Sequence, residues 1–141
     1  MSEQSNDRFF LNPNEMAFRK IYWPLIESEQ VTKVFRPGDR SCGCWRGYCS
    51  GQEIELKVID KIGVDWARVE PIFDSGLCKK VAIREVIVKR IKDLIDEDFK
   101  GATPDVYDQA SLRYNLGVIY NFFPEELTDD TPITITTFAY L

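Results

Sequence analysis

The amino-acid sequence predicts an α+β domain, in which two main helices cover a curved, mostly antiparallel sheet that forms a small barrel or strongly bent sheet. Two segments with helical periodicity, 13–28 and 108–121, stand on either side of several segments with strand character. The sequence shows no regular alternation of strand and helix, which disfavours a parallel, doubly wound sheet. A length of 141 residues fits one domain, 1–141, whose residues 1–10 form a loose polar lead-in.

The first helix is expected over 13–28. Asn12 can cap it, Pro13 suits the first helical position, and Glu15 stands where a capping box requires a carboxylate. Pro24 lies inside the pattern, where it removes a backbone hydrogen bond and predicts a kink. The apolar residues that recur at helical spacing, and so form one buried face, are Phe18, Ile21, Tyr22, Leu25 and Ile26.

The middle of the chain predicts strands, because its segments are rich in β-branched residues or alternate between apolar and polar side chains. These strands are expected at 31–36, 53–62, 64–69 and 81–90. Pro37, Gly38 and Asp39 supply turn chemistry after the first strand. Loops are expected at 40–52 and at 71–80.

The last third of the chain predicts a helical turn, a helix and a closing strand. The turn falls in the acidic segment 91–99, and the strand is expected at 131–141. Asp108 can cap a helix over 109–120, whose inner face carries Leu112, Leu116 and Ile119.

The charge balance limits the kind of partner. The chain has 18 Lys and Arg against 23 Asp and Glu, a formal net charge of −5, which disfavours broad, non-specific binding to nucleic acid. A local basic groove remains compatible with this balance, because local potential matters more than total charge. Acidic residues concentrate at 93–98 and 125–130, so the region 33–46 is relatively basic.

Histidine is absent, which excludes a Ser-His-Asp triad, a Cys-His dyad and any histidine-ligated metal centre. The run Asp93, Asp96, Glu97 and Asp98 could hold a metal or act as acid and base, but a solvated acidic face is much the commoner reading. We expect no cofactor.

The location and the cysteines are interpreted together. No apolar run approaches the ~18 residues that span a bilayer, and the N-terminal residues lack signal-peptide character, so we expect a cytoplasmic protein with no membrane partner. We therefore expect reduced thiols and no disulfide. Structural zinc is the alternative, but the spacing departs from paired CxxC ligands, and no metal site is predicted. The cysteines are Cys42, Cys44, Cys49 and Cys78.

A cluster of cations and aromatic side chains lies in and beside the loop 40–52. Single-stranded RNA sites use such residues, since guanidinium groups bind phosphates and aromatic rings stack on bases. In the alternative reading, the aromatic rings pack on the barrel and the arginines pair with carboxylates. Tyr120 and Asn121, at the end of the second helix, could line the same cleft. The loop candidates are Arg36, Arg40, Trp45, Arg46 and Tyr48.

Several segments together resemble the ASCH domains, a branch of the PUA-like barrel superfamily. They are LIES at the end of the first helix, TKVFR and RPGD around the first strand, DLIDEDF after the central strand, and LGVIYN before the last strand. The resemblance covers nearly the whole chain from about residue 14 and implies a PUA-like β-barrel.

The chain departs from the Gly-x-Lys-x-x-Glu-x-Arg pattern of this family. Glu29 and Val31 occupy the Gly and Lys places, Val34 occupies the Glu or Thr place, and Arg36 alone matches. Some bacterial members of the family hydrolyse amides on modified cytidine with that Lys, a Thr and a Glu, so the departure argues against inherited hydrolase activity. Lys33 is a weak candidate for a displaced catalytic amine, because residues 33 and 36 point to opposite faces of an ideal strand.

Three functions remain as hypotheses. The leading one is a small module that binds RNA or a nucleotide-like ligand. The second is an amidohydrolase that acts on a modified nucleoside with a rearranged site, which a buried Lys–carboxylate pair in the same cleft would favour. The third is an interaction protein, which an unpaired apolar edge at 133–140 would favour.

Overall fold

The computed structural model describes residues 13–44, 47–61, 72–120 and 126–141, with only the backbone of 59–61, 72–77 and 119–120. Five strands form one sheet in the order β1-β3-β4-β5-β2. The strands are β1 Glu15–Arg19, β2 Lys33–Pro37, β3 Glu53–Lys61, β4 Ile72–Arg90 and β5 Pro132–Tyr140. The helices are α1 Trp23–Glu27 and α2 Gln109–Tyr120, with 3-10 turns η2 Lys20–Tyr22, η3 Ile91–Asp93 and η4 Asp96–Phe99.

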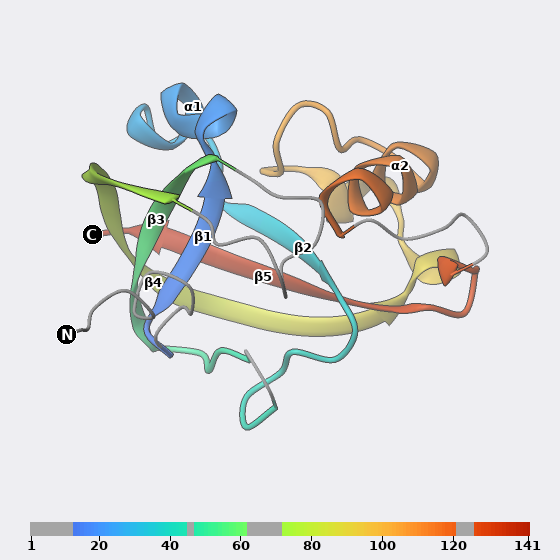
Figure 1. Cartoon of the computed structure of the whole chain (residues 1–141). Helices are drawn as coiled ribbons and strands as arrows, with labels where there is room; N and C mark the ends of the chain where they lie inside the picture. The colour runs from blue at the N-terminus through green and yellow to red at the C-terminus, as the bar shows by residue number, and fades with distance from the viewer. Residues whose placement is uncertain (1–12, 45–46, 62–71, 121–125) are drawn as a thin grey trace, which may run out of the picture.

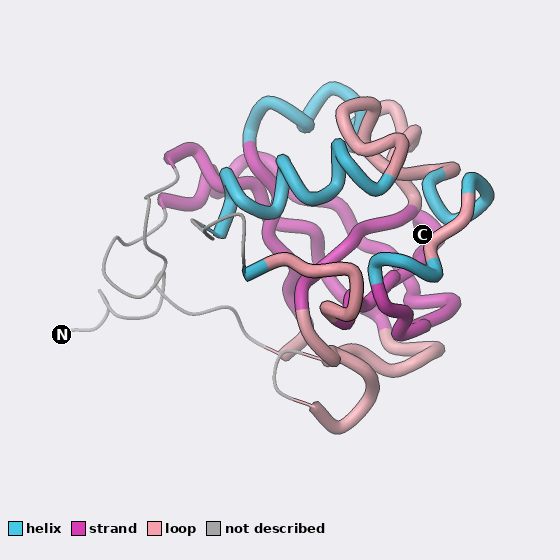
Figure 2. The backbone as a smooth tube through the Cα atoms, turned by 90° about the vertical axis from the view of Figure 1, so that its right-hand side faces the viewer, coloured by secondary structure: helices cyan, strands magenta, loops and turns pink. Residues whose placement is uncertain are grey.

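The sheet is mostly antiparallel and curls into a half-barrel. β3 with β4, β4 with β5 and β5 with β2 are antiparallel pairs, while β1 runs parallel to β3. Figures 1 and 2 show α1 over one end of the curl and α2 lying across its outer face. The predicted α+β fold class is therefore confirmed, and β1 and β2 are the two edge strands.

The curled sheet has an apolar core on each face. The inner core collects residues from all five strands and from α1, among them Phe18, Val34, Leu56 and Phe138. The outer core joins β2 and β5 to α2 and the 3-10 turns, and its central residues are Phe35, Phe99, Leu112, Leu116 and Ile135. Because side chains alternate along β2, Val34 and Phe35 enter different cores.

The prediction of one helix over 13–28 is wrong for its first part. Residues 15–19 form β1, with Met16 and Phe18 buried and their neighbours half-exposed. This alternation also fits a strand, and the parallel pairing with β3 decides between the two readings. Pro24 lies in the first turn of α1, which begins at Trp23, instead of kinking a longer helix, because the first turn needs no donor at that position. Asn12, the expected cap, lies outside the described residues.

The expected loop at 71–80 is also wrong. Strand β4 begins at Ile72 and runs for 19 residues. Register shifts in its pairing with β3, between Lys57 and Ile59 and between Ile59 and Lys61, absorb the irregular segment that looked like a loop. The predicted strand at 64–69 falls outside the described residues.

Apart from the early start of β4, the strands predicted at 31–36, 53–62 and 131–141 and the helix at 109–120 are confirmed within two residues, and the turn at 91–99 is present as η3 and η4. The cap of α2 is confirmed as well, because Asp108 Oδ1 accepts the Ser111 N–H at 2.7 Å and Ser111 Oγ accepts the Asp108 N–H at 3.0 Å. Strand β5 pairs with β4 on one side and β2 on the other, so the unpaired edge required by the interaction-protein hypothesis is absent. No helix in the described part of the chain is long and apolar enough to cross a bilayer.

Candidate functional site

The two edge strands turn their outer backbone groups toward each other. The Glu55 N–H donates to the Asn14 carbonyl, so the even-numbered residues of β1 face β3, and the carbonyls of Glu15 and Ala17 face the open edge. The Phe138 N–H donates to the Thr32 carbonyl, which leaves the Phe35 carbonyl on the open edge of β2. We call the gap between these edges, with the side chains that bridge it, the seam.

Arg36 connects the two sides of the seam. Its Nη1 donates to the Phe35 carbonyl at 3.2 Å, and its Nη2 donates to the Ala17 carbonyl at 3.0 Å. Its guanidinium carbon lies 5.6 Å from the ring centre of Phe18. These contacts fix a planar cation where a ladder of backbone hydrogen bonds would otherwise close the barrel.

Two further side chains, from the loop that follows β2, donate to β1 and to the residues just before it. The Tyr48 hydroxyl donates to the Glu15 carbonyl. Gln52 Nε2 donates to the Pro13 carbonyl at 2.9 Å. The carbonyls of residues 13, 15 and 17 each therefore accept a side-chain donor, which protects this edge from pairing with another strand.

The charge of Arg36 is not paired with a carboxylate among the residues that the structure describes; its partners there are two carbonyl oxygens and the Phe18 ring. Other cations do have carboxylate partners: Lys89 Nζ lies 2.9 Å from Asp98 Oδ2, and Arg113 pairs with Asp129. A guanidinium has five N–H donors, so Arg36 retains donors for an oxyanion after these two bonds.

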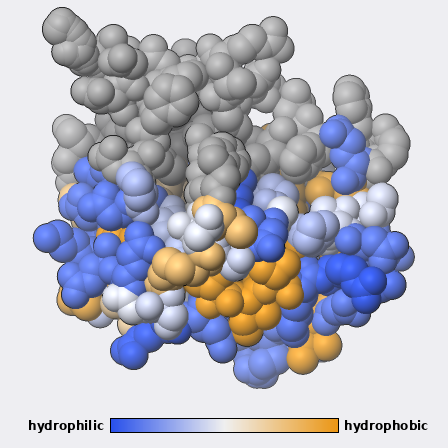
Figure 3. All heavy atoms as spheres, turned by 90° about the horizontal axis from the view of Figure 1, so that it is seen from below, coloured by the Kyte–Doolittle hydropathy of each residue, from blue (hydrophilic) through white to orange (hydrophobic). Residues whose placement is uncertain are grey.

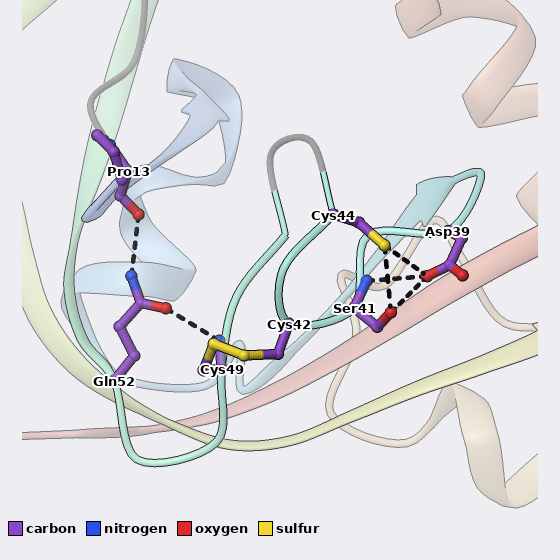
Figure 4. Close-up of a disulfide and its surroundings, with 7 residues drawn as sticks. All are labelled: Pro13, Asp39, Ser41, Cys42, Cys44, Cys49 and Gln52. Atoms are coloured by element: carbon purple, nitrogen blue, oxygen red, sulfur yellow. Dashed lines mark hydrogen bonds between the residues drawn. A yellow bond between two sulfur atoms is a disulfide. The ribbon is translucent and has the colours of Figure 1, made fainter.

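The loop after β2 contains a disulfide between Cys42 and Cys49, shown in Figure 4, so the expectation of reduced thiols is wrong for this pair. Reduced thiols were expected because the sequence predicts a cytoplasmic protein. That expectation did not consider that the fold brings Cys42 and Cys49 together. Cys44 and Cys78 are free and exposed. In the described part of the chain, no three His, Cys, Asp or Glu side chains are grouped as metal ligands.

The start of this loop is tied to the sheet. The Arg40 N–H donates to Thr134 Oγ1 at 2.7 Å, and the Thr134 hydroxyl donates to the Gly38 carbonyl at 2.7 Å. Asp39 Oδ1 accepts the hydroxyl of Ser41 at 2.6 Å and its N–H at 3.0 Å, and these bonds lower the pKa of the Asp39 carboxyl. Thr134 is also the register partner of Arg36, so Arg36 and the backbone of Arg40 approach the same residue.

The predicted loop residues have different outcomes. Tyr48 is only 9% exposed and belongs to the inner core, so its ring is no free stacking surface. Arg36 and Arg40 are half-buried beside Thr134. Trp45, Arg46 and Asn121 lie outside the described residues, and only the backbone of Tyr120 is described.

Lys33 points away from Arg36. Its Nζ donates to the Glu97 carbonyl at 3.4 Å, on the side of the outer core. The partly buried pair of Lys89 and Asp98 lies on this side too, since Lys89 is the register partner of Ile133. Burial would raise the pKa of Asp98, but the Ile95 N–H and the Lys89 ammonium together lower it. A second pair, Lys57 Nζ with Glu15 Oε2 at 3.7 Å, has side chains 27% and 17% exposed and lies on the sheet face opposite Phe18. The described residues therefore contain no buried Lys–carboxylate pair on the face of Arg36, as the hydrolase hypothesis would require.

Sequence reasoning missed a polar cluster between η2 and the segment before α2. The Tyr22 hydroxyl donates to Asp105 Oδ2 at 2.5 Å, and the Thr103 hydroxyl donates to Asp105 Oδ1 at 2.6 Å. Burial, followed by the bond to Asp105, raises the pKa of Tyr22 to about 12. Tyr22 and Asp105 are 83 positions apart, so no local pattern could reveal the contact. The cluster joins two parts of the fold.

No family model matches the sequence, and no curated protein matches it. Solved structures do match. Hypothetical protein PH0355 shares 14% identity with a TM-score of 0.50, covering 90% of this chain and 97% of its own. Protein EF3133 from Enterococcus faecalis V583, a DUF984 protein, shares 12% identity over 86% of this chain and 70% of its own, with a TM-score of 0.48.

The ASCH domain from Lactobacillus crispatus JV V101 is also similar, with 10% identity, a TM-score of 0.45, and coverage of 85% of this chain and 70% of its own. The fold and the seam define an α+β half-barrel domain, and this chain shares its fold with hypothetical protein PH0355. An ASCH domain is thus among the solved structures that are similar to this chain.

Proposed function

We propose that this protein is a small module that binds RNA or a nucleotide-like ligand at the seam and the adjoining loop. The observation that carries the proposal is Arg36, a half-buried guanidinium held by two carbonyls and the Phe18 ring, with no carboxylate partner among the described residues. A fixed cation with remaining N–H donors is suited to a phosphate or carbonyl oxygen.

The local charge supports an anionic ligand. Residues 36–52 contain Arg36, Arg40 and Arg46 against Asp39, so the segment carries three positive charges and one negative charge in a chain of net −5. Arg40 and Arg46 are proposed to attract the ligand. Trp45 is proposed as the stacking ring in place of the buried Tyr48, and Tyr120 and Asn121 as further contacts.

The construction of the loop supports the proposal in a second way. The Cys42–Cys49 disulfide and the turn at Asp39 restrict the loop before any ligand arrives, which lowers the entropic cost of binding. The loop extends from the lower end of the sheet in Figure 1. Figure 3 shows that end, where apolar side chains gather among hydrophilic ones. Ligands that combine bases with phosphates require both kinds of contact.

The test is a titration of short single-stranded RNAs and modified nucleosides against wild type, Arg36→Ala and Arg36→Lys. We expect Arg36→Ala to weaken binding by about 1–3 kcal/mol, and Arg36→Lys to recover only part of the loss because it lacks the planar fork. Lys100→Ala is the charge-matched control, since Lys100 is 74% exposed and pairs with Glu97 next to η4.

Two results would overturn the proposal. One is wild type that binds none of these ligands at sub-millimolar concentration. The other is a folded Arg36→Ala protein with unchanged affinity. Release of acetate from an acylated nucleoside by wild type would put the hydrolase hypothesis in its place.

A further inference from the structure

Three of the four cysteines lie within eight positions of one loop. Cys42 and Cys49 form the disulfide, with Cα atoms 4.5 Å apart. Figure 4 shows Cys44 turned away from this bond, toward Ser41 and Asp39, with its sulfur 3.5 Å from Ser41 Oγ and 3.7 Å from Asp39 Oδ1. Cys42 is exposed and Cys49 is half-buried, so an attacking thiol from solvent reaches the Cys42 side of the bond.

The disulfide adjoins two of the side chains that donate across the seam. Tyr48, next to Cys49 in the chain, donates to the Glu15 carbonyl. The Cys49 N–H donates to Gln52 Oε1 at 2.9 Å, and Gln52 Nε2 donates to the Pro13 carbonyl at 2.9 Å. The bridge to Cys42 therefore limits the motion of the segment that positions both donors.

We propose that the Cys42–Cys49 disulfide is a reversible thiol-exchange site, with small dithiols as its reductants, and that its redox state sets the order of this loop and of the seam bonds beside it. A thiolate of the dithiol attacks Cys42 Sγ, the disulfide breaks, and Cys49 leaves as a thiolate that takes a proton. The second thiol of the reductant then displaces Cys42. Two electrons pass to the protein, which gains two thiols, while the dithiol becomes a cyclic disulfide.

Re-formation of the bond is a local event. The two cysteines are separated by seven positions, so the ring closes without moving the strands. Neither cysteine belongs to the inner or the outer core, so we expect the reduced protein to keep its sheet and its helices.

The test uses full-length protein with Cys78→Ser, which removes the exposed free thiol on β4. After treatment with oxidised glutathione, alkylation and mass spectrometry should find Cys44 modified and Cys42–Cys49 intact. Dithiothreitol should make all three loop thiols reactive. Hydrogen exchange should then rise in peptides 39–44 and 47–52 and stay unchanged in β4 and β5, and Tm should fall by about 5–10 °C, the scale for a short disulfide ring.

Two variants serve as controls. Cys44→Ser keeps the bridge and should respond to dithiothreitol like the parent protein. Cys42→Ser should show the exchange pattern of the reduced state with or without dithiothreitol. Reactive Cys42 and Cys49 after the oxidation step would overturn the proposal, as would a clean reduction that leaves exchange at 39–44 and 47–52 unchanged.

The result is separable from the proposed function. RNA affinity that is unchanged when the disulfide is reduced, together with faster exchange in the loop, would count against the loop as an RNA contact and would support the redox site. Unchanged exchange would count against the redox site whatever the RNA titration shows.

Discussion

The outer core and the seam, which meet at strand β2, are stabilised by different interactions. On the outer face, Phe35 stacks on Phe99 with ring centres 5.3 Å apart and packs beneath α2. On the inner face, Arg36 donates to carbonyls on both sides of the seam. The outer face is closed by apolar burial, which has little directional requirement, and the seam by a few directional polar bonds. We infer that the apolar cores supply most of the stability, and that the seam holds the groups available to a ligand.

The largest effect is expected on the outer face. Phe35→Ala should lower the free energy of unfolding by about 3–5 kcal/mol, because it removes a buried aromatic ring and leaves a cavity. Denaturant unfolding measures the change. Val118→Ala is the control, since Val118 is 49% exposed on α2 and its truncation should change stability little. A loss for Phe35→Ala no larger than that control would contradict the division between the outer core and the seam.

At the seam, Arg36→Ala should lower the free energy of unfolding by about 1–3 kcal/mol, since two carbonyls lose a charged donor. The same denaturant experiment compares it with Phe35→Ala. Hydrogen exchange should rise along β1 and β2 while α2 keeps its protection. Equal loss of protection in α2 would show that the seam and the outer core unfold as one unit.

A smaller effect is expected for Tyr48→Phe. This change keeps the buried ring but removes the donor to the Glu15 carbonyl, so unfolding should become easier by about 1 kcal/mol. Tyr107→Phe, at a tyrosine that is 66% exposed, is the matched control and should have no measurable effect. If the two variants unfold alike, the Tyr48 bond contributes nothing to closing the seam.

Alkaline pH should destabilise the protein through its buried phenols. Burial comes first among the causes that raise the pKa of Tyr22 and of Tyr140 to about 12, against ~10 in an unfolded chain. Between these values the unfolded chain releases a proton that the folded protein keeps. The stabilisation is therefore complete below pH ~10 and is lost as the pH rises toward 12. Unfolding of wild type and Tyr22→Phe across this range measures it, and equal slopes for the two proteins would refute the contribution of Tyr22.

Local patterns predicted part of this fold. Strand β3, strand β5 and the capped helix α2 follow from periodicity and turn chemistry within each segment. Strand β1 was missed because five alternating residues run directly into a helical pattern, and its pairing with β3 depends on a segment far along the chain. The start of β4 was missed because its irregular sequence looked like a loop. Register shifts allow this segment to pair with β3.

The geometry of the candidate site could be foreseen only in part, for a similar reason. Arg36 was singled out by its match to a family pattern, and the structure places it at the seam. Its contact with Ala17 arises only when the sheet curls and brings the two edge strands together. The disulfide and the Tyr22–Asp105 bond likewise depend on the folded chain, since nothing in the local sequence indicates which side chains become partners.

The central claim is that Arg36 both closes the seam and binds the ligand. The most direct test is the salt dependence of RNA binding by wild type and by folded Arg36→Ala. Each phosphate contact to a single strand contributes about −0.7 to the slope of log K against log salt concentration. We predict a slope that is shallower by about that amount in Arg36→Ala, together with weaker binding at low salt. Weaker binding with an unchanged slope would contradict the claim, because Arg36 would then act only through the structure of the seam.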